Sequence, residues 1–298
     1  MKRWPACVLV VAASVALAGA DAVSAPRTTP YESLVRLYDY DAAAPLDVRE
    51  ESVEDAGGAT VHYLSFASPK GGRATAALVL PAPAGARVPA VVVQPGFGSR
   101  ADEAVPTGVA FARIGAAALA LDPPHVRSIG PRFRCRLSDR KAYIQYVVEL
   151  RRAVDLLSAR PEVDPNRLGY TGFSYGAVVG GTLSGIDHRI KAFALQSGGP
   201  RFSLVQRNQC TQLSRKRLAA YVRALRFSDA INYVGHAAPS ALLFQNGTHD
   251  PLYTRKSIRR YFAAASRPKT LRWYRAGHAL TPRANADRDA FLRSQLGF

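Results

Sequence analysis

The segment LGYTGFSYGAVVGG, residues 168–181, contains the pattern G-x-S-x-G, formed by Gly172, Ser174 and Gly176. The preceding residues, RLGYTG, are typical of a buried strand, and the following YGAVVGG favours a helix of small residues. A serine between such elements stands on a sharp turn, where the glycines let the backbones approach each other without a Cβ clash. The pattern also arises by chance, but in this context it predicts that Ser174 is a catalytic nucleophile.

A serine nucleophile needs a histidine to take its proton and a carboxylate to orient that histidine. In a fold of this kind the acid and then the histidine follow the serine, each at the carboxyl end of a later strand. The segment LLFQNGTHDPL places Asp250 just past a predicted strand, and LRWYRAGHAL places His278 just past the next one. The sequence therefore predicts a triad of Ser174, Asp250 and His278.

Other candidates for the base and the acid fit this topology less well. His249 adjoins the predicted acid, His188 lies in a polar turn, His236 precedes its strand and His62 lies on an early strand. Asp187 is the best rival acid, but it also precedes its strand. A turn aspartate without a catalytic role remains the alternative interpretation of Asp250.

An oxyanion hole requires two backbone N–H donors. One is expected from Tyr175, directly after the nucleophile, and the other from the loop QPGFGS that follows the first buried parallel strand. We expect Phe97 to supply the second N–H, with Gly98 as the alternative. An ordinary turn is the remaining interpretation of this loop.

The flanking sequence alternates between strand and helix patterns. Segments 59–68 and 73–81 are predicted to form an antiparallel hairpin. Further strands are predicted at 90–96, 115–124, 167–172, 190–198, 239–247 and 269–277, and helices at 102–114, 139–160, after residue 175, near 254–265 and at the C-terminus. This alternation predicts a mainly parallel sheet covered on both faces. A small insertion follows the sixth strand, as a polar and basic stretch that runs to about residue 228.

These motifs resemble the α/β-hydrolase family, and within it the dienelactone-hydrolase-like and acyl-esterase members. The resemblance rests on GFSYG, the PGFG loop, NGTHDP and AGHAL, and runs from about residue 59 to the C-terminus. It implies an eight-stranded, mostly parallel sheet, the same triad, and neither a cofactor nor a metal. Gln94 and Pro95 stand where lipases often have a His-Gly pair. The nucleophile is a serine, unlike the cysteine of dienelactone hydrolases proper.

The first residues are typical of a secretory signal peptide. Lys2 and Arg3 precede an apolar run that is too short to cross a bilayer easily. The run predicts cleavage after Ala20, with a cut after Ala25 or an uncleaved anchor as alternatives. We therefore expect residues 1–20 to be removed, 26–298 to form a single α/β-hydrolase domain, and the protein to be secreted or periplasmic.

Two cysteines, Cys135 and Cys210, remain after this cleavage removes Cys7. In an oxidising compartment an even pair predicts a disulfide, with two buried thiols as the alternative.

Basic residues outnumber acidic ones, and removal of Lys2 and Arg3 lowers the net charge only from +18 to +16. Much of the excess lies at 126–141 and 201–226, two stretches that follow predicted strands at their ligand-binding ends. We expect them to form a cationic rim, with Arg132, Arg134 and Arg136, that favours anionic esters or an anionic envelope surface. Simple solvated charge is the alternative, and nucleic acid is not an expected partner.

The leading functional prediction is a secreted serine hydrolase that cleaves small-molecule or polymer carboxylic esters through an acyl-enzyme. A peptidase of the prolyl-oligopeptidase type is weakened because no propeller domain precedes the catalytic region. A non-catalytic protein with this fold that binds anionic envelope polymer is disfavoured by the complete predicted triad.

Overall fold

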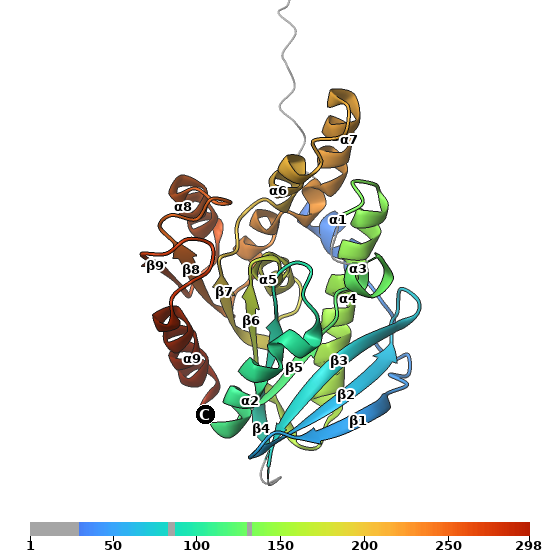
Figure 1. Ribbon diagram of the computed structural model, residues 1–298, viewed down its shortest axis with the longest axis vertical. Helices are drawn as coiled ribbons and strands as arrows, with labels where there is room; N and C mark the ends of the chain where they lie inside the picture. The colour runs from blue at the N-terminus through green and yellow to red at the C-terminus, as the bar shows by residue number, and fades with distance from the viewer. Residues whose placement is uncertain (1–29, 83–86, 130–132) are drawn as a thin grey trace, which may run out of the picture.

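A computed structural model describes residues 30–82, 87–129 and 133–298 (Figure 1). The described residues form one nine-stranded sheet in the order β1-β2-β3-β5-β4-β6-β7-β8-β9. Its strands are β1 (Arg49–Asp55), β2 (Ala59–Ala67), β3 (Arg73–Pro81), β4 (Val88–Gln94), β5 (Ala117–Leu121), β6 (Val163–Phe173), β7 (Ile190–Gln196), β8 (Ala241–Gly247) and β9 (Lys269–Tyr274). Neighbouring strands pair in parallel through the part of the sheet with the order β5-β4-β6-β7-β8-β9. The pairs β1 with β2, β2 with β3 and β3 with β5 are antiparallel. The mainly parallel sheet is confirmed.

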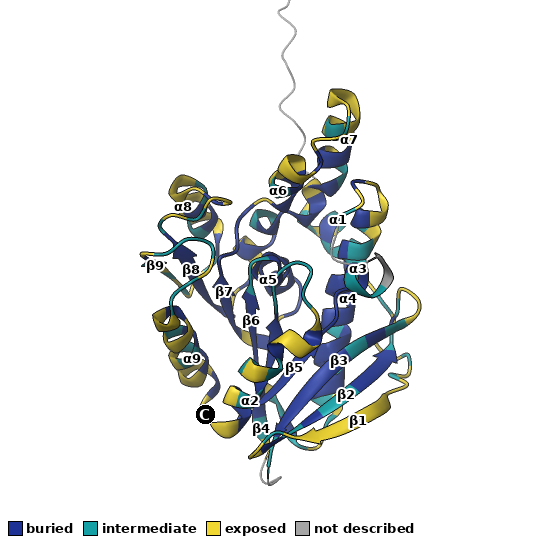
Figure 2. Ribbon diagram, viewed as in Figure 1, coloured by how far each residue is buried: buried dark blue, intermediate teal, exposed yellow. Residues whose placement is uncertain are grey.

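The expected count of eight strands is one too low, because the sequence pattern does not reveal β1. The segment REESVED is exposed at every position and has no alternating apolar face. β1 pairs only with β2, at the edge of the sheet, and Figure 2 shows it exposed along its length. Backbone hydrogen bonding alone therefore defines this strand, and hydrophobic periodicity cannot detect it.

Helices cover both faces of the sheet, as predicted. They are α1 (Tyr31–Val35), α2 (Val105–Arg113), α3 (Pro124–Ile129), α4 (Ser138–Ala159), α5 (Tyr175–Ser184), α6 (Phe202–Gln209), α7 (Arg215–Leu225), α8 (Arg255–Ala264) and α9 (Pro282–Leu296). Two separate hydrophobic clusters result: α2 and α9 pack on one face, while α4, α5 and α8 pack on the other. This burial of apolar surface on both sides accounts for the continuous apolar runs of the central strands.

The insertion after the sixth predicted strand is confirmed, because α6 and α7 follow β7 directly in the chain. In Figure 1 they form the top of the molecule, above the carboxyl ends of the parallel strands. The predicted signal peptide, with its cleavage after residue 20 or 25, lies outside the described residues. Among the residues that are described, no helix has the length and apolar character of a membrane span.

Candidate active site

Ser174 lies on the turn between β6 and α5, and its φ angle is +53°. Glycine is required on both sides of Ser174 because other backbone atoms lie very close to these two positions. A Cβ on Gly172 would lie 2.4 Å from the carbonyl carbon of Gly176, and a Cβ on Gly176 would lie 2.4 Å from the carbonyl oxygen of Gln94. The backbone N–H of Ser174 donates to the carbonyl of Gln196, at 2.8 Å. The turn therefore depends on the glycines of the G-x-S-x-G pattern, and it holds a positive φ that a non-glycine residue seldom adopts.

The three residues predicted as a triad come together at the carboxyl ends of β6, β8 and β9. Nε2 of His278 lies 2.8 Å from Oγ of Ser174, and Nδ1 lies 2.9 Å from Oδ2 of Asp250. The Asp250 side chain is fully buried, and its other oxygen accepts the N–H of Leu252 at 2.8 Å. A carboxylate at Nδ1 favours the tautomer that carries its proton there. Nε2 is then free to accept the hydroxyl proton of Ser174.

Four of the five rival residues have other partners. His62 lies 2.8 Å from Glu50, and His236 stacks on Tyr31. His249 lies 3.0 Å from the hydroxyl of Thr248, its neighbour in the chain. Asp187 forms an ion pair with Arg189. None of these four contacts Ser174 among the interactions of the described residues.

The predicted oxyanion donors are the N–H groups of Phe97 and Tyr175. Phe97 precedes the nucleophile in the sequence and Tyr175 follows it, but the two residues are neighbours in space. Their rings meet edge to face, with centroids 5.5 Å apart. Both residues line the same cavity as Ser174. The alternative donor, Gly98, has a φ of +86°, which fits the tight turn of this loop. The donor roles themselves stay a prediction.

His125, at the start of α3, was not among the candidate residues predicted from the sequence. The residue is only 3% exposed, and its ring lies nearly parallel to that of Phe97, with centroids 4.6 Å apart. Its Nε2 has no hydrogen-bond partner among the described residues. Burial lowers the pKa of His125 to about 4, so the ring is neutral at neutral pH. The sequence signal for His125 was its position just past β5, near the carboxyl ends of the parallel strands, where ligands bind.

Two cavities of different character meet at Ser174. The first, which we call the aromatic pocket, has a volume of about 360 Å³. Its walls carry five aromatic rings, those of Phe97, Phe133, Tyr175, Phe202 and Tyr253. The second, the polar cavity, measures about 500 Å³ and lies on the side of α2 and α9. Its polar side chains include those of Glu103, Thr107, Gln196 and Arg288, and His278 also lines it.

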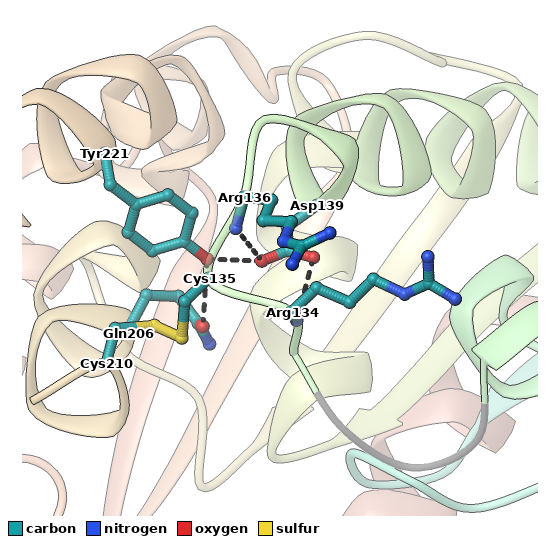
Figure 3. Close-up of a disulfide and its surroundings, with 7 residues drawn as sticks. All are labelled: Arg134, Cys135, Arg136, Asp139, Gln206, Cys210 and Tyr221. Carbon is teal, nitrogen blue, oxygen red and sulfur yellow. Dashed lines mark hydrogen bonds between the residues drawn. A yellow bond between two sulfur atoms is a disulfide. The ribbon is translucent and has the colours of Figure 1, made fainter. Parts of the chain in front are cut away.

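The predicted disulfide is present: Cys135 and Cys210 are bonded, with Cα atoms 5.7 Å apart. It joins the loop before α4 to the end of α6 (Figure 3). Beside it, the buried carboxylate of Asp139 accepts the backbone N–H groups of Arg134 and Arg136 and the hydroxyl of Tyr221 on α7. These contacts fix one wall of the aromatic pocket, because Cys135 belongs to its lining.

The candidate site contains no arrangement suited to a metal. Within the described ranges, no group of three or more His, Cys, Asp and Glu side chains lies close enough together to hold a metal ion.

Comparison with solved structures identifies the fold. An acetyl xylan esterase from a Paenibacillus species superimposes with a TM-score of 0.73 at 18% identity, covering 89% of this chain and 93% of that chain. An acetyl xylan esterase from Thermoanaerobacterium gives a TM-score of 0.73 at 14% identity with the same coverage, and a glucuronoyl esterase from Solibacter usitatus gives 0.64 at 15%, covering 89% and 92%. The protein has the α/β-hydrolase fold. No protein-family model matches the sequence, and no curated protein matches it.

Proposed function

We propose that the protein is a serine hydrolase that cleaves carboxylic esters through an acyl-enzyme intermediate. The observation that carries the proposal is the continuous hydrogen-bonded chain from Asp250 through His278 to Ser174, with lengths of 2.9 and 2.8 Å. The likeness of the fold to that of enzymes named as esterases supports esters over peptides as the substrate class. The two cavities that meet at Ser174 leave room for both halves of an ester, one in each cavity.

The proposed reaction has two halves. Ser174 Oγ attacks the ester carbonyl as His278 Nε2 accepts the hydroxyl proton, and Asp250 stabilises the resulting imidazolium. The N–H groups of Phe97 and Tyr175 donate to the oxyanion of the tetrahedral intermediate. His278 then gives its proton to the leaving alcohol, and water hydrolyses the acyl-enzyme by the same steps in reverse order.

Secretion is part of the proposal. The Cys135–Cys210 disulfide supports it, since such bonds persist mainly in oxidising compartments.

Covalent labelling tests the nucleophile directly. We expect a fluorophosphonate probe to label the purified mature protein and not the Ser174→Ala variant. Ser184→Ala is the matched control, because Ser184 is a buried serine at the end of α5, the helix that follows Ser174, and its hydroxyl donates to the carbonyl of Gly181. Absence of labelling in the folded wild type would overturn the proposal, as would labelling that survives the loss of Ser174.

The cationic rim remains a proposal about specificity. Arg134 and Arg136 are exposed, whereas Arg132 lies outside the described residues. Figure 3 shows the Arg134 side chain extending away from the disulfide. Replacing Arg134 and Arg136 by glutamine is expected to lower kcat/KM for 4-nitrophenyl hemisuccinate by about two- to fivefold, because exposed charges interact weakly through water.

The corresponding butyrate ester, which carries no charge, is expected to be unaffected by these substitutions. Arg293→Gln, near the C-terminus, is the control for a general loss of positive charge. Added salt should reduce the difference between the two esters. Equal effects on the hemisuccinate and the butyrate would refute the rim.

A further inference from the structure

The two cavities at Ser174 differ in how they relate to the catalytic base. Ser174 and Phe97 line both of them, so each cavity has access to the attacking oxygen and to the oxyanion loop. His278 lines the polar cavity and is absent from the described lining of the aromatic pocket. The two halves of a bound ester are therefore not interchangeable between these cavities.

The position of His278 sets the orientation of the ester. In the proposed mechanism the proton on Nε2 passes to the oxygen of the leaving alcohol. That oxygen must lie within hydrogen-bond reach of Nε2, on the side of the polar cavity. The acyl chain, on the other side of the carbonyl carbon, then extends into the aromatic pocket.

On this basis we propose that the aromatic pocket binds the acyl group and the polar cavity the alcohol, and that the substrates are esters of acids with a ring on a short linker. The proposal rests on the proposed ester hydrolysis and deepens it by naming the acyl class. The proposed acyl class differs from the acetyl group that appears in the names of two of the structural neighbours.

The size and chemistry of the aromatic pocket support a ring-bearing acyl group. An apolar cavity of about 150 Å³ is enough to hold benzene, and this pocket measures about 360 Å³. Its wall rings already pack on one another in both of the geometries that aromatic pairs prefer: Phe97 stacks on Phe133 with centroids 3.9 Å apart, and Tyr175 meets Phe133 edge to face. Aromatic guests pack favourably in either geometry. An acetyl group would leave most of this volume unfilled.

The pocket is also held in shape without a ligand. The disulfide fixes Cys135 against α6, and Asp139 binds both the loop of Cys135 and Tyr221 on α7. The Tyr221 hydroxyl lies 3.4 Å from Oε1 of Gln206, another lining residue. Binding a rigid acyl group to a preformed wall avoids much of the entropic cost of ordering the wall.

Two isomeric esters test the orientation. Methyl 3-phenylpropanoate carries the ring on its acyl side, and 2-phenylethyl acetate carries the same ring on its alcohol side. We expect kcat/KM for the phenylpropanoate to exceed that for the acetate by at least about tenfold, after correction for their hydroxide-catalysed rates. An equal or reversed preference would overturn the assignment.

Variants that partly fill the aromatic pocket provide the second test. Val178 on α5 and Val205 on α6 both line it, and the variants Val178→Leu and Val205→Trp each narrow it from a different helix. Each variant is expected to lower the ratio of kcat/KM for methyl 3-phenylpropanoate to kcat/KM for 2-phenylethyl acetate by about tenfold. Leu204→Trp is the matched control, because Leu204 lies on α6 but is exposed and outside this pocket.

The outcomes separate the inference from the function on which it rests. A ratio that stays at the wild-type value in both pocket variants, when thermal unfolding shows them folded, would overturn the acyl assignment. If the fluorophosphonate labels Ser174 but neither isomer is hydrolysed, the acyl assignment is wrong and the serine hydrolase proposal stands. If Ser174 is not labelled at all, both proposals fail.

Discussion

His278→Ala is expected to lower kcat for ester hydrolysis by on the order of 10⁴- to 10⁶-fold. The variant removes the ring whose Nε2 lies 2.8 Å from Oγ of Ser174. In the proposed mechanism this nitrogen accepts the Ser174 proton and later protonates the leaving alcohol. The effect should appear mainly in kcat, because the aromatic pocket is unchanged and the polar cavity loses only the imidazole from its lining. Steady-state kinetics and burst measurements on an activated ester would measure it.

The matched control is His249→Ala. His249 adjoins Asp250, but its ring lies beside the Thr248 hydroxyl and makes no hydrogen bond or ring contact with Ser174 or His278 among the described residues. This variant should retain the wild-type kcat. A comparable loss in both variants would show that the region tolerates no change, and activity retained in His278→Ala would contradict the assigned base.

Asp250→Asn should lower kcat by on the order of 10⁴-fold, for a different reason. An amide at this position can donate to Nδ1 and so favours the tautomer that carries its proton on Nε2. That tautomer cannot accept the Ser174 proton. The double variant with His278→Ala should be little worse than His278→Ala alone, because residues that act as a unit are not additive.

The proximity of Ser174, Asp250 and His278 could be predicted from the sequence because each stands at a topological position with a local signal. Gly172 and Gly176 mark the turn at Ser174, and the order of acid and base follows the order of the strands. The structure brings the three side chains within hydrogen-bond distance of one another. Their spatial arrangement thus follows from strand order and from the shared carboxyl edge of a parallel sheet.

Features without a local sequence signal could not be predicted in this way. β1 has no apolar face and is held by pairing with β2 alone. His125 has no motif, and its environment arises from the stacking of Phe97 and Phe133, which are distant in sequence. The aromatic pocket likewise draws its walls from five separate segments of the chain. Such features depend on tertiary contacts that no local periodicity records.

Stability between pH 4 and 6.5 is expected to depend on two buried groups that act in opposite directions. Burial lowers the pKa of His125 to about 4, below the ordinary value for histidine. Its stabilising contribution is therefore complete above pH 6.5 and is lost as the pH falls through 4. Burial raises the pKa of Asp229 to about 6. Its contribution is complete below the ordinary pKa of aspartate and is lost as the pH rises through 6.

Each group contributes on the order of 3 kcal/mol to the free energy of unfolding across its range, at about 1.4 kcal/mol per pKa unit. The two contributions largely offset each other in the wild type. His125→Phe keeps an aromatic ring against Phe97 and removes the titration, so the variant should become less stable as the pH rises from 4 to 6. Asp229→Asn should show the reverse slope.

The Asp229→Asn variant is suited to this test because its partner can adapt. The Asp229 carboxylate accepts the backbone N–H of Ser203 at 2.8 Å and the Ser203 hydroxyl at 2.9 Å. The amide oxygen of asparagine can still accept the N–H, and the serine hydroxyl can accept from the amide nitrogen. Urea unfolding at half-unit pH intervals would give the slopes. Parallel profiles for the two variants would contradict the assignment, whereas opposite slopes would support a lowered pKa for His125 and a raised pKa for Asp229.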